Sequence, residues 1–246
     1  VNYFDFEKPA NNDFKCISQL WITGEMHTRR PDFIIYVNGI PLILMELKGT
    51  HRSLLDSYHD NIRDYKDTIP QIFWYNLGII LSNGITTKFG SLTSPYEFFS
   101  EWKKEKSELD ESSTTMRTAI RGICDQSSLL DIFDNFILFD ESAGKLKKIL
   151  PRYFQYFGVN RAYTQVLKRT ELDGKLGVFW HTQGSGKSFS MVYLSQKVLH
   201  HISGSFTFVI VTDRTQLDGQ AYSNFANVGA VYEKEVRAKS IENLKD

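Results

Sequence analysis

Hydrophobic and polar positions along the first third of the chain predict strands and a tight hairpin. Residues 14–23 form one candidate strand, and the near-continuous apolar run 33–37 forms a second one. The dipeptide Asn38-Gly39 follows at once, and it is the strongest short-range signal for a turn between two antiparallel strands. The apolar segment 41–47 then predicts the return strand of this hairpin.

The middle of the chain predicts a mixture of helices and strands. A polar segment at 53–66 has the composition of a helix, and 77–81 is a buried strand that the turn residues 82–84 connect to another. Residues 103–127 are polar and rich in serine, which indicates an exposed helix and loop. The apolar positions of 129–139 recur at helical spacing, so we expect a helix there.

The last part of the chain predicts the start of a parallel α/β sheet. We expect a helix near 151–169, a strand at 176–180, a helix at 187–200 and a strand at 206–212. A strand, a loop, a helix and a further strand in this order are typical of parallel sheets, in which a helix crosses from one strand to the next.

A break in the pattern at residues 140–144 divides the chain into two predicted units, residues 1–142 and residues 143–246. The length of 246 residues suffices for one large domain or two small ones. Because the chain starts at Val1 without a methionine and ends just after an apparent helix, we interpret it as a piece of a longer protein. We expect the first unit to lack its own N-terminus and the second to be truncated.

Composition and charge restrict what the chain can be. Hydrophobic residues make up 41% and charged residues 24% of the sequence, which is ordinary for a globular protein and excludes general disorder. The 29 basic and 29 acidic residues cancel, so a nucleic acid would have to bind a local patch. Cys16 and Cys124 fit a reducing compartment, and no apolar run approaches the ~18 residues that cross a bilayer. We therefore expect a cytoplasmic protein without a membrane partner.

A glycine-rich segment, Gly184-Ser185-Gly186-Lys187-Ser188, predicts a loop that binds nucleotide phosphates. Such a loop needs glycines because its backbone N–H groups point at phosphate oxygens, where a Cβ would obstruct them. The lysine carries charge to the β- and γ-phosphates, and the following serine hydroxyl reaches Mg²⁺. The general pattern has a glycine where this chain has His181, and that departure is typical of superfamily 2 helicases and translocases. We therefore predict ATP and Mg²⁺ as cofactors.

Other residues around this loop are candidates for ligand contacts. Gln155 lies ahead of the loop, where such motors use a glutamine to bind adenine, although a surface glutamine is the commoner explanation. Asp213 and Arg214 follow the strand at 206–212, at the end where parallel strands present ligand-binding residues. We predict that they contact the DNA backbone, the alternative being an ordinary helix cap. The candidate nucleotide-binding residues are Gln155, Thr182, Gln183, Gly184, Ser185, Gly186, Lys187 and Ser188, and Ser188 is also a candidate Mg²⁺ ligand.

The hairpin near the N-terminus carries a second set of candidate residues. Asp32 precedes its first strand, and Glu46 and Lys48 lie at the end of its second strand. Two carboxylates supply the hard oxygen ligands that Mg²⁺ needs for phosphodiester cleavage, and Lys48 can orient or activate the attacking water. The alternative is that Asp32 and Lys48 are solvent-facing charges on an edge hairpin. The apolar run 42–45 argues against it, because a carboxylate after such a run is buried and needs a partner or a metal.

The register of this hairpin decides whether the two carboxylates meet. A two-residue turn would pair Val37 with Ile40 and leave Asp32 opposite Met45, so that Glu46 would point to the other face of the sheet. A three-residue loop shifts the pairing by one position and brings Asp32 opposite Glu46. We predict the second register, with a bulge at the turn.

Together these motifs resemble one family, the restriction (R) subunit of type I restriction–modification enzymes. The resemblance extends over almost the whole chain, and its motifs are more specific than a phosphate loop alone. They are Pro31-Asp32, Glu46-Leu47-Lys48, the segments 37–42 and 81–84, the Trp180-His181-Thr182-Gln183 entrance to the glycine-rich loop, and Asp213-Arg214 followed by Leu217 and Gln220.

This resemblance implies a PD-(D/E)xK endonuclease domain of the mixed-sheet α/β type over the first unit, followed by the start of a RecA-like superfamily 2 motor domain. By position, Asp32 and Glu46 would hold the metal, and Lys48 and Tyr65 would serve catalysis with them. Asn61, a shorter amide, stands where the family has a glutamine, and it is not among the predicted site residues. Such a subunit moves double-stranded DNA with ATP and then cuts it, together with methyltransferase and specificity subunits.

A complete motor needs more than the motifs of this chain. Its acidic Walker B pair must follow the phosphate loop, whereas Asp140-Glu141 precedes it, so we expect this chain alone to lack ATPase activity. Two other functions stay open. One is a nuclease–helicase of another DNA defence or repair system, and the other is a DNA-binding motor module with an inert nuclease site.

Overall fold

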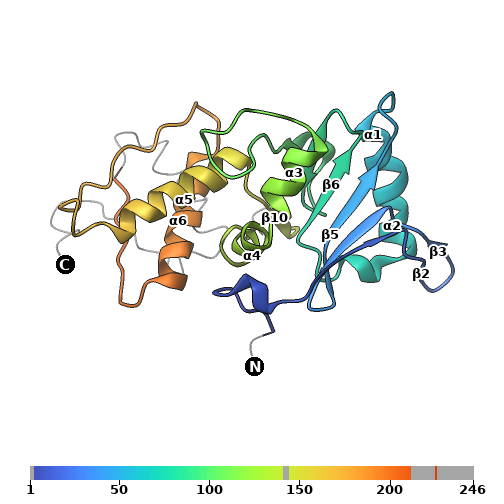
Figure 1. The fold of residues 1–246 in the computed structure, drawn as a ribbon, viewed down its shortest axis with the longest axis horizontal. Helices are drawn as coiled ribbons and strands as arrows, with labels where there is room; N and C mark the ends of the chain where they lie inside the picture. Colours follow the sequence, from blue (N-terminus) through green and yellow to red (C-terminus); the bar gives the residue numbers. More distant parts are fainter. Residues whose placement is uncertain (1–2, 141–143, 212–224, 226–246) are drawn as a thin grey trace.

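The computed structural model describes residues 3–140, 144–211 and 225, and the first part of this described chain is built on a six-stranded sheet (Figure 1). The strand order is β1-β4-β5-β6-β7-β8, in which β5 and β6 run parallel and the other neighbours are antiparallel. The expected mixed sheet is therefore present. The strands are β1 (Phe14–Ser18), β4 (Phe33–Val37), β5 (Ile40–Leu47), β6 (Gly78–Ser82), β7 (Thr87–Gly90) and β8 (Ser100–Glu101).

The β4–β5 hairpin has the two-residue turn that its sequence favours. Asn38 and Gly39 both have positive φ, 51° and 82°, as the tight turn requires. Val37 pairs with Ile40 across this turn, so the expected three-residue loop is wrong.

A β-bulge inside the hairpin nevertheless produces the expected register at its open end. Without a bulge, the turn would pair Ile35 with Leu42. Ile35 instead pairs with Ile43, because Leu42 is an extra residue in β5. Continued along the strands, this shifted pairing places Asp32 opposite Glu46. The register was predicted correctly, but the position of the bulge was not.

The single strand expected over residues 14–23 is interrupted. β1 ends at Ser18, and Gln19 takes a left-handed conformation with a φ of 51°. The chain then enters β2 (Ile22–Thr23), which pairs with β3 (Thr28–Arg29) in a separate two-stranded ribbon. The break therefore turns half of the expected strand into a hairpin outside the main sheet.

The parallel pairing of β5 with β6 needs a crossover connection, and the helix expected between them provides it. α1 (Leu54–Asp56), a π-helical stretch (Ser57–Ile62) and α2 (Arg63–Thr68) follow one another without interruption. The Ser53 hydroxyl caps the start of this crossover helix by accepting a hydrogen bond from the Leu55 N–H. The π-helical stretch has no signal in the apolar pattern.

Both faces of the sheet are buried, which explains its continuous apolar runs. On one face Ile34 and Ile79 pack with Ile62 of the crossover helix, whereas the other face belongs to a larger core with the later helices (Figure 1). Among these helices, α5 and α6 confirm the ones expected near 151–169 and at 187–200. The later helices are α3 (Met116–Ile123), α4 (Gln126–Asn135), α5 (Tyr153–Leu167) and α6 (Lys187–His201), and short 3-10 turns lie at Pro9–Asn11, Pro70–Phe73 and Tyr96–Phe98.

α4 is shorter than the helix expected over residues 129–139. It ends at Asn135, and Phe136 leaves the helical conformation with a φ of −126°. The chain continues into β9 (Leu138–Asp140), which pairs with β10 (Lys147–Ile149). Apolar spacing alone did not distinguish the last turn of a helix from the following short strand.

The strands expected at 176–180 and 206–212 are wrong as far as the structure describes them. Both segments, the second up to residue 211, lack regular structure, and Val178 and Val211 are 93% and 86% exposed. A parallel strand needs backbone partners and cover on both faces. In the described part of the chain, these segments have no strand partners and no cover on both faces. They therefore do not form the expected parallel sheet.

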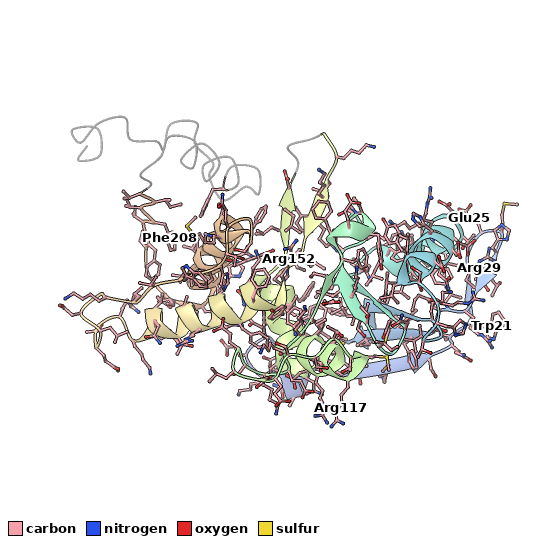
Figure 2. The ribbon with its side chains drawn as sticks, turned by 90° about the horizontal axis from the view of Figure 1, so that it is seen from above. Trp21, Glu25, Arg29, Arg117, Arg152 and Phe208 are labelled. Carbon is pink, nitrogen blue, oxygen red and sulfur yellow. The ribbon has the colours of Figure 1, made fainter. Side chains whose placement is uncertain are left out.

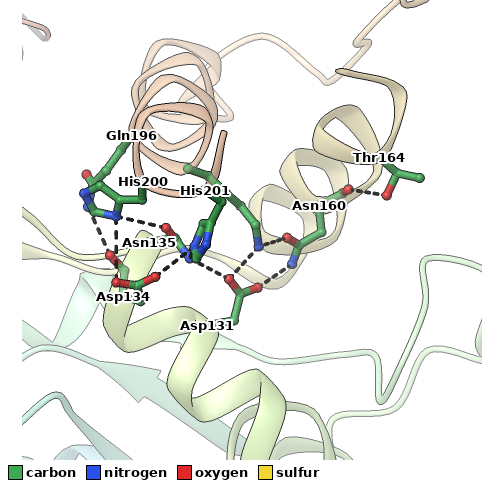
Figure 3. Close-up of polar contacts among 9 residues, drawn as sticks. Asp131, Asp134, Asn135, Asn160, Thr164, Gln196, His200 and His201 are labelled. Atoms are coloured by element: carbon green, nitrogen blue, oxygen red, sulfur yellow. Dashed lines mark hydrogen bonds and ion pairs between the residues drawn. The ribbon is translucent and has the colours of Figure 1, made fainter. Parts of the chain in front are cut away.

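A buried polar network joins α4 to α5 and α6 (Figure 3). Lys197 of α6 is 8% exposed, and its Nζ donates to Asp131 Oδ1 at 2.5 Å and to Asn160 Oδ1 at 2.6 Å. The Asn160 amide donates in turn to Asp131 Oδ2 at 3.0 Å. Nearby, the Asp134 carboxylate lies 2.9 Å from His201 Nε2. Charged and polar groups on three helices are thus paired, with Lys197 buried and His201 at the exposed edge of the network.

Aromatic side chains surround this network. The Phe136 ring lies between Tyr156 of α5 and Tyr193 of α6, at centroid distances of 5.0 and 5.3 Å. These rings belong to the same buried cluster as the apolar side chains of the main sheet. Residues on both sides of the break at 140–144 therefore share one core, and the domain boundary expected there stays a prediction.

Removing the charge of Lys197 would leave Asp131 in a mostly buried network without its cation. We expect Lys197→Met to lower the free energy of unfolding by about 3 kcal/mol, as is usual when one partner of a buried pair is removed. The exposed Lys175 provides a matched control, and Lys175→Met should change the same quantity by less than about 0.5 kcal/mol. Urea unfolding followed by circular dichroism measures both. Equal stability of the two variants would mean that the network does not hold the helices together.

Candidate active site

The shifted register of the β4–β5 hairpin brings Asp32 and Glu46 together. The Asp32 N–H donates to Glu46 Oε1 at 3.2 Å, and the Leu47 N–H donates to Asp32 Oδ2 at 2.7 Å. Each carboxylate is therefore held by a backbone N–H of the opposite strand. This arrangement leaves two acidic side chains side by side at the end of the hairpin.

The crossover helix adds an amide and a phenol to this pair. Lys48 Nζ donates to Asn61 Oδ1 at 2.8 Å, and Asn61 Nδ2 donates to Glu46 Oε2 at 2.7 Å. The Tyr65 hydroxyl lies 3.5 Å from Asn61 Nδ2. Asn61 was not among the predicted site residues, yet it connects the lysine to the buried carboxylate. Its position four residues before Tyr65, on the same helix face, is the sequence signal that points to it.

Burial dominates the electrostatics of the cluster. Glu46 is 1% exposed, and this burial, together with the nearby charge of Asp32, raises the pKa of the Glu46 carboxyl to about 7. Hydrogen bonds from the Asp32 backbone, Tyr65 and Asn61 lower that pKa, but they do not cancel the effect of burial. Burial and the Glu46 charge also raise the pKa of the Tyr65 phenol, so Tyr65 remains a neutral hydrogen-bonding group.

The donor set of this cluster fits a hard divalent cation such as Mg²⁺. Mg²⁺ keeps several waters and takes one or two protein carboxylates, which Asp32 and Glu46 can supply. Within the described ranges, no group of three or more His, Cys, Asp and Glu side chains gathers into a site of the kind that zinc prefers. A cation beside Glu46 would favour its charged form and so oppose the effect of burial on its pKa.

The glycine-rich segment forms a loop that leads directly into α6. Gly184 and Gly186 have φ values of 75° and 79°, and Gly186 is the N-cap of the helix. Lys187 Nζ donates to the carbonyl oxygens of His181 and Thr182, at 2.9 and 3.0 Å. The loop therefore has the backbone conformation that glycine permits, and its lysine reaches back over the loop. A loop at a helix N-terminus is a suitable place for a phosphate.

Gln155 is buried beneath this loop. Its Nε2 donates to the Gly186 carbonyl at 3.0 Å and to the Ser185 carbonyl at 3.3 Å, and its Oε1 accepts from the Arg152 N–H at 2.9 Å. A Cβ built on Gly186 would come within 2.8 Å of Gln155 Nε2, so only glycine fits there without a shift. The side chain of Gln155 thus supports the glycine-rich loop, and its predicted contact with adenine stays a prediction.

The other predicted nucleotide-binding residues are spread around the loop. Thr182 and Gln183 are exposed, and Ser188 is half-buried in the first turn of α6. The Ser185 hydroxyl is buried, and it has no hydrogen-bond partner among the residues that the structure describes. The predicted DNA contacts at positions 213 and 214 lie outside the described residues.

Two family models match parts of the chain. Residues 1–98, which include the hairpin and the crossover helix, match the N terminus of the type I restriction enzyme R protein. Residues 154–246, which include the glycine-rich loop, match the SWI2/SNF2 ATPase. Each model thus covers one of the two centres described above.

Curated relatives match nearly the whole chain. The HindI endonuclease subunit, a type I restriction enzyme of Haemophilus influenzae, is 38% identical over 92% of this chain and 23% of its own length. The putative type I MjaIXP endonuclease subunit of Methanocaldococcus jannaschii is 29% identical over 100% of this chain and 26% of its own length. The chain spans about a quarter of the length of these relatives. The resemblance to the R subunit of type I restriction enzymes is confirmed.

In the described part of the chain, helices that could cross a bilayer are not found.

The raised pKa of Glu46 predicts a dependence of stability on pH. Its folded-state pKa, about 7, lies above the ordinary value of 4.5, so its contribution is fully present below about pH 4.5 and is lost as the pH rises through 7. We expect the stability of the chain relative to the Glu46→Gln variant to fall by about 3 kcal/mol between pH 4.5 and pH 8. Urea unfolding without divalent cations measures this difference.

The exposed Glu171 is a suitable control for this measurement. Stability relative to Glu171→Gln should stay nearly constant over the same pH range, because an exposed carboxyl titrates alike in the folded and unfolded chain. A flat difference for Glu46→Gln as well would contradict the assigned burial of the carboxyl.

Proposed function

We propose that this chain is the nuclease-bearing part of an R subunit of a type I restriction–modification system, which cuts double-stranded DNA in reactions that need Mg²⁺ and ATP. The observation that carries the proposal is the cluster of Asp32, Glu46 and Lys48, in which two carboxylates face each other and the lysine is linked to one of them through Asn61. The relatives that match the chain are type I restriction enzyme endonuclease subunits, which supports it.

Each residue of the cluster has a separate role in this proposal. Asp32 and Glu46 would hold Mg²⁺, which would supply charge stabilisation at the phosphate. Lys48 orients the attacking water, and Asn61 keeps the lysine Nζ at a fixed place next to Glu46. Tyr65 helps to fix the Asn61 amide from the next turn of the helix. The proposed nuclease domain has the PD-(D/E)xK fold. The mixed sheet would supply its strands, and the crossover helix would supply the helix that packs beside the catalytic residues.

The phosphate loop gives the chain its second proposed role. Gly184, Gly186 and Lys187 would bind the ATP phosphates, and Ser188 would reach the Mg²⁺ of the nucleotide. The match to an ATPase family supports a RecA-like motor that moves DNA, of which this chain has the phosphate loop but not the later acidic pair. We propose that Asp213 and Arg214 contact the DNA backbone. Methyltransferase and specificity subunits are the proposed partners, and they would select the DNA sequence.

The Lys48 assignment can be tested by substitution in the full-length protein. We expect Lys48→Ala to reduce ATP-dependent DNA cleavage at least roughly 100-fold, because the group that orients the attacking water is lost. The affinity for DNA and the ATPase rate should remain at the wild-type level. Lys106, an exposed lysine of the same unit, provides the control, and Lys106→Ala should cleave normally. Cleavage that survives in Lys48→Ala would refute the proposed nuclease centre.

The phosphate loop requires a separate test. We expect Lys187→Ala in the full-length protein to abolish ATP hydrolysis and to reduce ATP-dependent cleavage at least roughly 100-fold, because charge at the transferred phosphate is no longer stabilised. Lys175→Ala serves as the control from an exposed position. Cleavage that proceeds equally well without ATP would favour a nuclease of another DNA defence or repair system.

A further inference from the structure

The β2–β3 hairpin, residues 22–29, projects from the sheet next to the proposed nuclease centre. Figure 2 shows Trp21, Glu25 and Arg29 together at the end of the molecule far from Phe208. Trp21 is 65% exposed at the start of the hairpin, and Met26 at its tip is 86% exposed. Trp21 and Met26 thus give this well-formed element exposed apolar surface.

The base of this hairpin is fastened to the elements that carry the nuclease centre. Arg29 forms a bidentate pair with Asp64 of the crossover helix, with Nε and Nη2 at 2.5 and 2.9 Å from the carboxylate oxygens. Gln71, in the 3-10 turn that follows the crossover helix, donates from Nε2 to the Thr23 carbonyl at 3.0 Å. Gly24 approaches the backbone of the crossover helix so closely that a Cβ would not fit. The hairpin is therefore held rigidly and cannot swing away from the centre as a free loop.

Trp21 and Arg30 form a pair beside Asp32. The Arg30 guanidinium lies over the Trp21 ring at 5.0 Å from its centroid, and both side chains are exposed. Within the described residues Arg30 has no carboxylate partner, in contrast to Arg29. The Cα of Arg30 lies at most about 7 Å from that of Asp32, because only two peptide units join them along the chain. An arginine without an acidic partner among the described residues thus leaves the backbone close to Asp32.

The charges of the nuclease centre make such a cation useful. Asp32 and Glu46 repel a DNA phosphate until a metal neutralises them, and the whole chain has no excess positive charge. A guanidinium stacked on an aromatic ring is held in place and still exposes its N–H donors to a phosphate oxygen. The hairpin therefore offers what the acidic pair lacks, a fixed positive group at the edge of the site.

We infer that the β2–β3 hairpin is a DNA-contacting element, in which Arg30, held by Trp21, binds a backbone phosphate next to the one cut at Asp32 and Glu46. This inference rests on the proposed nuclease function. Arg30 is a positioning residue that guides the strand into the site, and it takes no part in the bond-breaking step. Since a phosphate has the same charge in every sequence, the contact is independent of the DNA sequence.

The experiment uses the full-length protein with Arg30→Gln, and with Arg117→Gln as the control. Arg117 is exposed on α3, and Figure 2 shows it well away from Trp21. We expect Arg30→Gln to weaken binding to a short DNA duplex without a recognition sequence by roughly tenfold at about 0.1 M salt, and to lower the salt slope by about one. The KM of cleavage should rise by a similar factor while kcat stays within about twofold. Arg117→Gln should leave all three quantities unchanged.

Two further variants keep the outcomes distinct. Arg30→Lys keeps the positive charge but loses the planar guanidinium that stacks on Trp21, so it should restore the salt slope and only part of the DNA affinity, whereas a merely structural role of the guanidinium would leave the salt slope low. Binding by Arg30→Gln is also measured in the Lys48→Ala background, where the DNA stays uncut. If Lys48→Ala still cleaves, the nuclease proposal fails, whereas the binding data continue to test the hairpin.

Wild-type affinity and KM for Arg30→Gln would overturn the inference. Normal DNA binding with loss of assembly with the partner subunits would overturn it too, because the hairpin would then be a protein-docking surface.

Discussion

One extra residue in β5 determines whether the proposed nuclease centre exists. Because side chains alternate between the faces of a strand, a shift of one position moves every later residue of the hairpin to the opposite face. The bulge at Leu42 makes that shift, and Asp32 then lies opposite Glu46 instead of Met45. A buried carboxylate in an apolar strand would otherwise be strongly unfavourable. Here the Asp32 N–H and the Asn61 amide hold it, so register, hydrogen bonding and burial depend on one another.

The centre was predictable in its residues and only partly in its geometry. The turn at Asn38-Gly39 has a clear local signal, and both residues adopt the conformation that it implies. A bulge in mid-strand has no comparable signal, because it arises from packing on both faces of the sheet, and the sequence therefore suggested a longer turn. Asn61 was left out of the predicted site residues because its amide is shorter than the glutamine of the resembled family. It lies in the π-helical stretch of the crossover helix, and such stretches are frequent at functional positions.

The second half of the chain illustrates the opposite limit. α5 and α6 form as expected, because helical hydrogen bonds are made within the segment itself. The strands expected at 176–180 and 206–212 depend on partners elsewhere, and a strand without partners leaves its backbone groups unpaired. Apolar runs such as the one around Val178 show that a segment suits a buried strand, but they do not supply the neighbours. Local pattern is therefore a sound guide to helices here and an incomplete one to strands.

α6 connects the glycine-rich loop to α4 by a single rigid element. It starts at Lys187, directly after the loop, and near its other end Lys197 and His201 contact α4. A helix of this length spans about 20 Å, and its own hydrogen bonds resist bending. A displacement of the loop that moves α6 as a body must therefore carry α4 with it or break the buried pair of Lys197 and Asp131. Breaking that pair would leave a charge uncompensated, so coordinated movement of the helices is energetically favoured.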